Sequence, residues 1–234
     1  MSFENKTVMV TGAAGNLGQA VAAAFASQDA RLVLLDRQVE SLQAAFGDEG
    51  ENRLFVATDL LDGQQVAAAL TAAVERFGRI DVLCNLAGGF RMGDAVHETA
   101  DSTWDFLLDI NARTLLNMVR AVVPHMLESG GGKIVNVGAY AAQKGVAQMG
   151  AYCAAKSSVI RLTEAMAAEL REQHINVNCV LPTIIDTPEN RAAMPAADPS
   201  RWVAAKDLAS VIVFLASDAA HAVHGAALPV TGLS

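Results

Sequence analysis

Two side chains suited to proton transfer, Tyr152 and Lys156, lie four positions apart in an alanine-rich stretch without a helix breaker. Residues four apart on a helix face the same side. A phenol has a reference pKa of about 10, and a neighbouring ammonium group favours its ionised form. The spacing therefore predicts a tyrosine that donates or accepts a proton near neutral pH.

A glycine-rich segment near the N-terminus, residues 11–18 (TGAAGNLG), lies between an apolar run and a helical pattern. Glycines in this position allow a tight turn and a close approach to a pyrophosphate, which binds the free N–H groups of a helix N-terminus. The segment predicts a dinucleotide-binding turn formed by Gly12, Gly15, Asn16, Leu17 and Gly18.

The choice between NAD and NADP falls to two adjacent residues with opposite charges. Asp36 ends the second apolar run, eighteen residues after Gly18. A carboxylate there accepts hydrogen bonds from the adenosine ribose and repels a 2′-phosphate, whereas an arginine holds that phosphate. Asp36 has the more direct position and favours NAD, while Arg37 keeps NADP possible.

Short apolar runs alternate with longer helical patterns along the whole chain. This alternation predicts a parallel sheet covered by helices on both faces, and continuous Val/Ile/Leu runs fit strands buried on both sides. The expected strands are 7–11, 31–36, 53–57, 80–85, 133–137, 176–181 and 227–230. The expected helices are 16–28, 38–46, 63–77, 102–129, 151–173 and 206–217, and residues 187–200 are expected to form an irregular flap beside the site.

Composition narrows the range of partners. A formal charge of −8 disfavours nucleic acid and anionic membranes. No run reaches the roughly 18 apolar residues of a membrane span, and the N-terminus lacks the pattern of a signal peptide. Three scattered cysteines argue against a disulfide framework and for a cytoplasmic location. His221 and His224 lack a third ligand nearby in the sequence, so no metal site is expected.

Six features occur in the order and spacing of the short-chain dehydrogenase/reductase family, which this chain resembles over its whole length. They are the glycine-rich turn, Asp59-Leu60, residues 85–88 (NLAG), Asn111, the Tyr152/Lys156 pair and Pro182. The resemblance implies that residues 1–234 form one doubly wound Rossmann domain with a seven-stranded sheet in the order 3-2-1-4-5-6-7. It implies an NAD(P)-dependent oxidoreductase that moves hydride between nicotinamide and a small carbonyl or alcohol.

The same resemblance assigns roles to individual positions. The diphosphate contacts of the family match Gly12, Leu17 and Gly18, and its adenine contact matches Asp59, followed by Leu60. The residues that line the coenzyme after the fourth strand match Asn85, Ala87 and Gly88, and those on the nicotinamide side match Pro182, Ile184 and Thr187. Tyr152 matches the acid/base. Lys156 matches the residue that binds the nicotinamide ribose and lowers the tyrosine pKa, and Asn111 matches a proton relay. Pairing of helices 102–129 and 151–173 implies a homodimer or homotetramer.

The sequence departs from the family pattern at three positions. Asn16 and Thr183 stand where glycine is usual, and Ala139, thirteen residues before Tyr152, stands where the catalytic serine is usual. Loss of one such hydrogen-bond donor costs about a hundred- to thousandfold in rate. Tyr140, Gln143 and Gln148 are candidate substitutes, and Arg91, Asn190 and Arg191 are candidates for binding a substrate carboxylate, with surface solubility as the alternative role.

Two other functions remain as alternatives. Ala139 is compatible with a protein that binds coenzyme as a sensor or assembly partner without catalysis, although intact Tyr152, Lys156 and Asn111 argue against it. The spacing of Gly12, Gly15 and Gly18 is also familiar from nucleotide-sugar epimerases. Those relatives use a longer C-terminal segment to bind the sugar nucleotide, so this function is disfavoured.

Overall fold

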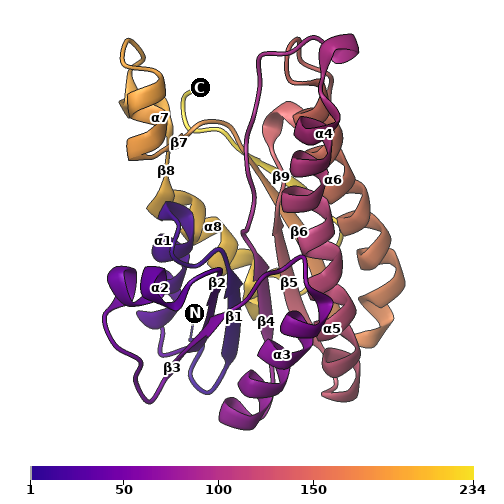
Figure 1. Ribbon diagram of the computed structural model, residues 1–234. Coiled ribbons are helices and arrows are strands. Elements are labelled where there is room, and N and C mark those ends of the chain that lie inside the picture. The colour runs from indigo at the N-terminus through magenta and orange to yellow at the C-terminus, as the bar shows by residue number, and fades with distance from the viewer. Residues whose placement is uncertain (1) are drawn as a thin grey trace.

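The computed structural model describes residues 2–234 and contains a seven-stranded parallel sheet (Figure 1). Its order is β3-β2-β1-β4-β5-β6-β9, which confirms the predicted order with β9 as the seventh strand. The strands are β1 (Thr7–Thr11), β2 (Arg31–Asp36), β3 (Arg53–Ala57), β4 (Val82–Asn85), β5 (Gly132–Val137), β6 (Ile175–Pro182) and β9 (Ala227–Val230). β1 and β6 are buried along their whole length, as their apolar runs predict.

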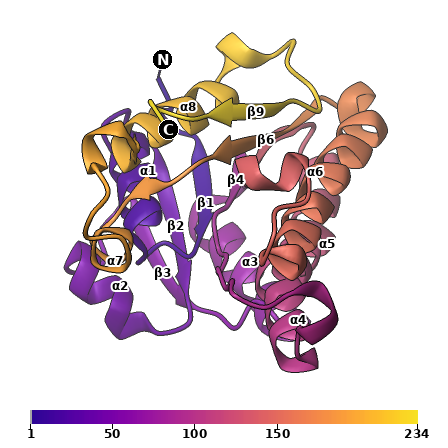
Figure 2. The ribbon, with the colours of Figure 1, turned by 90° about the horizontal axis from the view of Figure 1, so that it is seen from above.

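Helices cover both faces of the sheet, as the view from above shows (Figure 2). One face carries α1 (Asn16–Ala26), α2 (Val39–Phe46) and α8 (Ala205–Ala216), and the other carries α3 (Gly63–Phe77), α5 (Thr114–Glu128) and α6 (Gly150–Leu170). Each layer encloses its own apolar core, with Phe25 and Leu208 in the first and Met118 and Val159 in the second. The sheet therefore presents only its edges to solvent, and the carboxyl edge is where the predicted site residues gather.

The expected helix 102–129 is interrupted near its middle. The chain forms α4 (Asp101–Leu108), a π-helical segment (Asp109–Arg113) and then α5. The Asn111 side chain donates to the carbonyl of Leu107, four residues earlier, at 2.9 Å. A side chain that takes the i−4 carbonyl competes with the backbone N–H for that carbonyl, which is the physical reason for the wider π turn.

The expectation that residues 187–200 are irregular was wrong. This stretch contains a short helix, α7 (Pro188–Ala193), whose N-terminus is capped by Thr187. Proline suits the first position of a helix because it has no N–H to leave unpaired. A small two-stranded parallel sheet, β7 (Ile185–Asp186) with β8 (Val203–Ala204), flanks the helix on both sides in the sequence. The flap is therefore an ordered unit, a short helix between two parallel strands, above the carboxyl edge (Figure 1).

The remaining differences concern element ends. The helix expected at 16–28 stops at Ala26, and the one expected at 151–173 runs over α6 and ends in a 3-10 turn at Arg171–Gln173. The exact end of a helix depends on tertiary packing, which the helix propensities of single residues do not predict. Within residues 2–234, no helix is both long and apolar enough to cross a bilayer.

Candidate active site

The glycine-rich turn joins β1 to α1 and depends on two of its glycines. Gly12 has a φ of +62°, and a Cβ added there would lie 3.1 Å from the Cα of Ala87. A Cβ on Gly18 would lie 2.3 Å from the carbonyl oxygen of Gly12, so only glycine fits. Asn16 begins α1, and Gly15 before it has a φ of −70°. Asn16 is not among the residues with positive φ, so its backbone does not require the glycine usual at this position.

Thr11 connects the glycine-rich turn to the turn after β4, a role that the sequence analysis missed. Its buried hydroxyl accepts hydrogen bonds from the backbone N–H groups of Leu86 at 3.0 Å and Ala87 at 3.1 Å. An unpaired buried N–H costs about 1–3 kcal/mol, so this one hydroxyl stabilises both turns relative to each other. The position of Thr11 directly before Gly12 was the feature of the sequence that could have indicated this role.

The Asp36 side chain lies against the glycine-rich turn and does not extend into solvent. Its carboxylate accepts from the N–H of Ala14 at 3.0 Å and from the N–H of Arg37 at 2.8 Å. The carboxylate is thus fixed at the end of β2 beside the turn. For the exposed Arg37 side chain, the described residues supply no hydrogen bond or ion pair.

Asp59 and Leu60 lie farther along the same edge, after β3. The Asp59 carboxylate accepts from the N–H of Leu61 at 3.0 Å and is otherwise exposed, whereas Leu60 is buried in the core beside α5. The carbonyl of Leu60 accepts from Asn117 at 2.9 Å. The structure therefore separates this pair into an exposed carboxylate and a core residue.

Asn85 begins a chain of buried polar contacts beneath the site. Its amide donates to Asn136 at 2.9 Å, and Asn136 donates to Thr163 on α6 at 2.9 Å. Among residues 2–234, the buried Oδ1 of Asn85 has no hydrogen-bond partner. A buried acceptor without a donor is unusual in a folded protein and fits a place where a ligand supplies the donor.

Tyr152 lies near the start of α6, mostly buried against a residue that sequence reasoning did not find. The ring of Phe90 packs edge-on against the Tyr152 ring, with centroids 4.9 Å apart, although Phe90 itself is 54% exposed. Burial raises the pKa of Tyr152 to about 12. In the absence of ligand the phenol is therefore protonated at neutral pH, opposite to the lowered pKa that the sequence led us to expect.

Lys156 is buried one turn further along α6, with 5% of its surface exposed. Its ammonium group donates to the carbonyl of Val137 at 2.8 Å. Burial lowers the pKa of Lys156 from 10.5 to about 8, because desolvation disfavours the charged form. Desolvation also raises the Tyr152 pKa, and the charge of the neighbouring Cys153 adds to that rise.

Gly88 brings the lysine and the asparagine together. A Cβ added to Gly88 would lie 2.9 Å from Asn111 Oδ1 and 3.1 Å from Lys156 Nζ, so a side chain at this position would displace both groups. Asn111 also accepts from the N–H of Gly89 at 3.1 Å and donates to its carbonyl at 3.0 Å. The structure therefore places Asn111, Gly88 and Lys156 around one point of the carboxyl edge.

Ala139 follows β5 and is buried, with an extended backbone. Of the three candidate substitutes for a hydroxyl at this position, Gln148 lines the same cavity as Tyr152. Gln143 lines a different cavity, near Ile160 and Ala227, and Tyr140 is 43% exposed. The geometry therefore favours Gln148 among the three.

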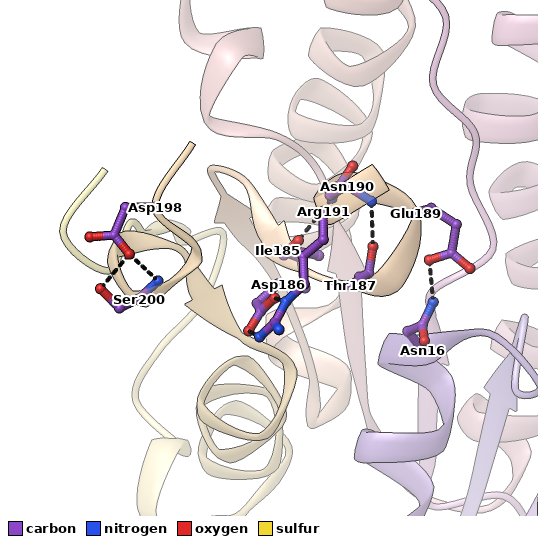
Figure 3. A network of polar contacts seen from close by, with 9 residues as sticks. All are labelled: Asn16, Ile185, Asp186, Thr187, Glu189, Asn190, Arg191, Asp198 and Ser200. Atoms are coloured by element: carbon purple, nitrogen blue, oxygen red, sulfur yellow. Dashed lines mark hydrogen bonds and ion pairs between the residues drawn. The ribbon is translucent and has the colours of Figure 1, made fainter. Parts of the chain in front are cut away.

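The flap after β6 is tied together by short polar contacts (Figure 3). Thr187 accepts from the N–H of Asn190 at 3.2 Å, and Arg191 forms a two-point ion pair with Asp186 at 2.6 and 2.8 Å. Asn16 at the start of α1 donates to Glu189 of α7 at 2.8 Å. Asn16, in the position where the family has glycine, thus joins the glycine-rich turn to the flap.

The residues expected on the nicotinamide side lie at the base of this flap. Pro182 ends β6, and the carbonyl of Ile184 accepts from the N–H of Val203 at 2.9 Å. The Thr183 hydroxyl donates to the carbonyl of Thr231 at 3.0 Å. Thr183 is not among the residues with positive φ, so its backbone does not require glycine.

A cavity of about 180 Å³ opens beside Tyr152, and Arg91 lines it. Of the three polar residues considered for substrate binding, only Arg91 has this position. Arg191 is engaged by Asp186, and Asn190 donates to the carbonyl of Ile185 at 2.8 Å. Among residues 2–234, no group of three or more His, Cys, Asp or Glu side chains is arranged to hold a metal ion.

Comparison with known proteins decides the family. A family model described as short chain dehydrogenase matches residues 6–197. The chain belongs to the short-chain dehydrogenase family. It is 37% identical to a D-threitol dehydrogenase of Mycolicibacterium smegmatis, over 98% of this chain and 93% of that protein. As a member of this family it is an NAD(P)-dependent oxidoreductase.

Two solved structures of the family resemble the fold closely. A short-chain type dehydrogenase/reductase from Mycobacterium ulcerans superposes with a TM-score of 0.93 at 27% identity, covering 100% of this chain and 90% of that one. An NAD⁺-bound xylitol dehydrogenase superposes with a TM-score of 0.90 at 26% identity, covering 99% and 100%. The likeness thus extends over the whole described chain of this short-chain dehydrogenase.

Burial of the Lys156 cation has a consequence for stability that can be measured. With a pKa of about 8 in the folded protein against 10.5 in an unfolded chain, the unfolded state binds more protons between these values, so stability rises with pH across that window. Below pH 8, burial of the ammonium group lowers the free energy of unfolding by its full amount. We expect Lys156→Met to be about 2 kcal/mol more stable than the wild type at pH 7, a gain that shrinks toward pH 10.

Urea unfolding at pH 7 and pH 10, without coenzyme, measures this difference. Lys206→Met, an exposed lysine on α8, is the matched control and is expected to change stability little at either pH. A Lys156→Met variant that is less stable than the wild type at pH 7 would contradict the account of the buried cation.

Proposed function

We propose that this short-chain dehydrogenase, acting as one catalytic domain over residues 1–234, transfers hydride between NAD(H) and a small secondary alcohol or its carbonyl, without a catalytic serine. The observation that carries the proposal is the approach of Lys156 and Asn111 to Gly88, one helical turn from Tyr152. A phenol, a buried cation and an amide beside a dinucleotide-binding turn are suited to proton transfer at the carbon that gains or loses hydride.

The residues of the carboxyl edge fit a dinucleotide. Gly12 and Gly18 let the turn pack without side chains that would clash with its own backbone and that of Ala87, and among residues 2–234 the buried Oδ1 of Asn85 has no hydrogen-bond partner. The diphosphate would bind at the glycine-rich turn, formed by Gly12, Gly15, Asn16, Leu17 and Gly18. The adenosine ribose would bind Asp36, and the adenine would lie beside Asp59 and Leu60. The wall of the coenzyme site would be formed by Asn85, Ala87 and Gly88, and the nicotinamide end would contact Pro182, Ile184 and Thr187. The bound nicotinamide would supply or accept the hydride.

Tyr152 is the proton donor in the reductive direction. Its raised pKa of about 12 keeps it protonated at neutral pH, so it can protonate the carbonyl oxygen as hydride reaches the carbon. In the oxidative direction the same oxygen must take the alcohol proton, which requires the ammonium of Lys156 to stabilise the phenolate. Lys156 has to leave Val137 or share its protons between that carbonyl and the ligand, and Asn111 then connects it to the Gly89 backbone.

Ala139 provides no hydrogen bond to the developing oxyanion. A missing donor raises the barrier by about 2.7–4 kcal/mol, so the reaction must use an activated substrate or another donor. Gln148 is our candidate for that donor because it lines the cavity that Tyr152 also lines.

Activity with NADH and 2,3-butanedione tests the catalytic proposal. Tyr152→Phe is expected to lower kcat/KM at least a hundredfold because the proton donor is lost. Ala139→Ser is expected to raise kcat/KM about tenfold or more because a donor is gained. Tyr140→Phe is expected to change the rate less than about twofold, since Tyr140 does not line the cavity. Coenzyme binding without turnover on any activated carbonyl would instead favour the non-catalytic sensor or assembly function.

The preference for NAD rests on the fixed carboxylate of Asp36. The xylitol dehydrogenase that resembles this chain is itself NAD⁺-bound. We expect Asp36→Asn, which keeps an acceptor for the Ala14 N–H but removes the charge, to shift the ratio of kcat/KM for NADH and NADPH toward NADPH by about tenfold. Arg37→Gln is expected to leave the NADH value within about twofold. A wild-type preference for NADPH that Arg37→Gln abolishes would reverse the assignment.

We propose that the protein forms a homodimer or homotetramer through the helical layer of α4, α5 and α6 (Figure 2). Trp104 on α4 and Leu127 on α5 are each 43% exposed, and burying these large apolar side chains against a second copy would be favourable. Sedimentation velocity at micromolar concentration is expected to show a dimer or larger, and Trp104→Glu to shift it toward monomer. A monomeric wild type would contradict the proposal.

A further inference from the structure

The cavity beside Tyr152 is small, and its walls are about half polar and half apolar, with Met92, Leu107 and Met149 among the apolar residues. Its volume of about 180 Å³ is below the roughly 300–1,000 Å³ of pockets for drug-sized ligands. The walls come from the loop after β4, from α4 and from the residues leading into α6, including Arg91, Asp94, Thr103, Gln148 and Tyr152. A ligand group bound there is therefore a few atoms long and lies next to the reacting centre.

Backbone constraints hold the two loops that form the cavity. The N–H of Gly93 donates to the carbonyl of Gln148 at 2.9 Å, joining the loop after β4 to the segment before α6. Gln148 has a φ of +61° and Gly93 a φ of +126°. A non-glycine residue in the left-handed region costs about 1–3 kcal/mol, and such strain is kept where the surrounding structure fixes it. The backbone of these two loops, as well as the exposed side chains, therefore determines the shape of the cavity.

Arg91 and Asp94 bring opposite charges to this cavity without neutralising each other. The Arg91 guanidinium stacks on the Phe106 ring, 3.9 Å from the ring centre. Stacking uses the face of the guanidinium and leaves its N–H donors, which lie in its plane, available. In the part of the chain that the structure describes, the side chains of Arg91 and Asp94 form no hydrogen bond or ion pair with each other or with another protein group. The cavity therefore offers donors and acceptors that water, rather than another side chain, occupies, and that a ligand can take over.

We propose that this cavity binds a further hydroxyl group of the substrate, which makes the substrate class a polyol: a secondary alcohol whose neighbouring carbons also carry hydroxyls. The inference rests on the proposed function and names its substrate class. The neighbouring hydroxyl would accept from Arg91 and donate to Asp94, while the reacting hydroxyl would give its proton to the Tyr152 phenolate stabilised by Lys156 and the hydride of its carbon would go to NAD⁺. A hydroxyl is the simple group that both donates and accepts.

Two other ligand chemistries fit the cavity less well. A carboxylate would gain from Arg91 but be repelled by Asp94, because like charges in a partly enclosed site disfavour binding. A hydrocarbon would gain contact with Met92, Leu107 and Met149, but it would remove water from both charged groups without replacing its hydrogen bonds. Because both side chains are exposed at the cavity mouth, the discrimination is expected to be tenfold to a hundredfold rather than larger.

Oxidation of a matched four-carbon series with NAD⁺ tests the substrate class. The series is 2-butanol, 2,3-butanediol, both enantiomers of 1,2,3,4-butanetetrol, and sodium 2,3,4-trihydroxybutanoate. We expect kcat/KM for at least one butanetetrol to exceed that for 2-butanol by more than tenfold, and to exceed that for the carboxylate. Butanetetrol oxidised no better than 2-butanol, or the carboxylate oxidised best, would overturn the inference.

Variants connect the selectivity to the two charged residues. Arg91→Gln and Asp94→Asn are each expected to lower the ratio of kcat/KM for butanetetrol over 2-butanol about tenfold. Asp94→Asn is also expected to raise the ratio for the carboxylate over butanetetrol, which loss of packing alone would not do. Asp105→Asn, an exposed acid on α4 outside the cavity, is the control, and its ratios are expected to match the wild type. Unchanged ratios in both cavity variants would overturn the assignment.

Reduction of 2,3-butanedione with NADH separates this inference from the proposed function. If the diketone is reduced and the activity depends on Tyr152 while the polyol preference is absent, only the polyol assignment fails. If neither the diketone nor any alcohol of the series reacts in a Tyr152-dependent way, the proposed function fails with it.

Discussion

Burial of an ammonium group at the carboxyl edge of the sheet is the constraint around which this site is organised. Lys156 is 5% exposed, and the hydrogen bond to Val137 keeps its charge from being unsatisfied. The absence of a side chain at Gly88 leaves room for the lysine, and Gly88 in turn lies against Asn111, which belongs to the π-helical segment between α4 and α5. Thr11 then fixes the turn that contains Gly88 to the glycine-rich turn. One buried cation thus relates four separate parts of the chain.

The same burial sets the chemistry. A partly desolvated pair of phenol and amine has its pKa values moved toward the neutral forms, about 12 for Tyr152 and about 8 for Lys156. The tyrosine is therefore ready to donate a proton, and its use as a base depends on the charge state of the lysine. This coupling matters more in a site where Ala139 replaces a hydroxyl, because fewer groups remain to stabilise the oxyanion.

The alternation of apolar runs and helical patterns predicted the parallel sheet, and helical spacing paired Tyr152 with Lys156. The strand order and the place of Gly88 were expected from the resemblance to the short-chain dehydrogenase/reductase family. The sequence could not predict the π segment at Asn111, where the side chain takes the Leu107 carbonyl, or the contact between Asn16 and Glu189, which are 173 residues apart. Local propensity also missed α7, whose six residues are stabilised by the Thr187 cap and by β7–β8 pairing. The direction of the Tyr152 pKa was wrong because burial cannot be read from helical spacing.

Transfer of deuterium from NADH deuterated at the reactive carbon of nicotinamide tests the central claim most directly. Mass spectrometry of the alcohol formed from 2,3-butanedione reports whether the label moves to the product carbon. The account predicts one deuterium per product molecule with the wild type and at least a hundredfold slower formation of labelled product with Tyr152→Phe. Bound NADH with no labelled product, or equal rates for the two proteins, would contradict it.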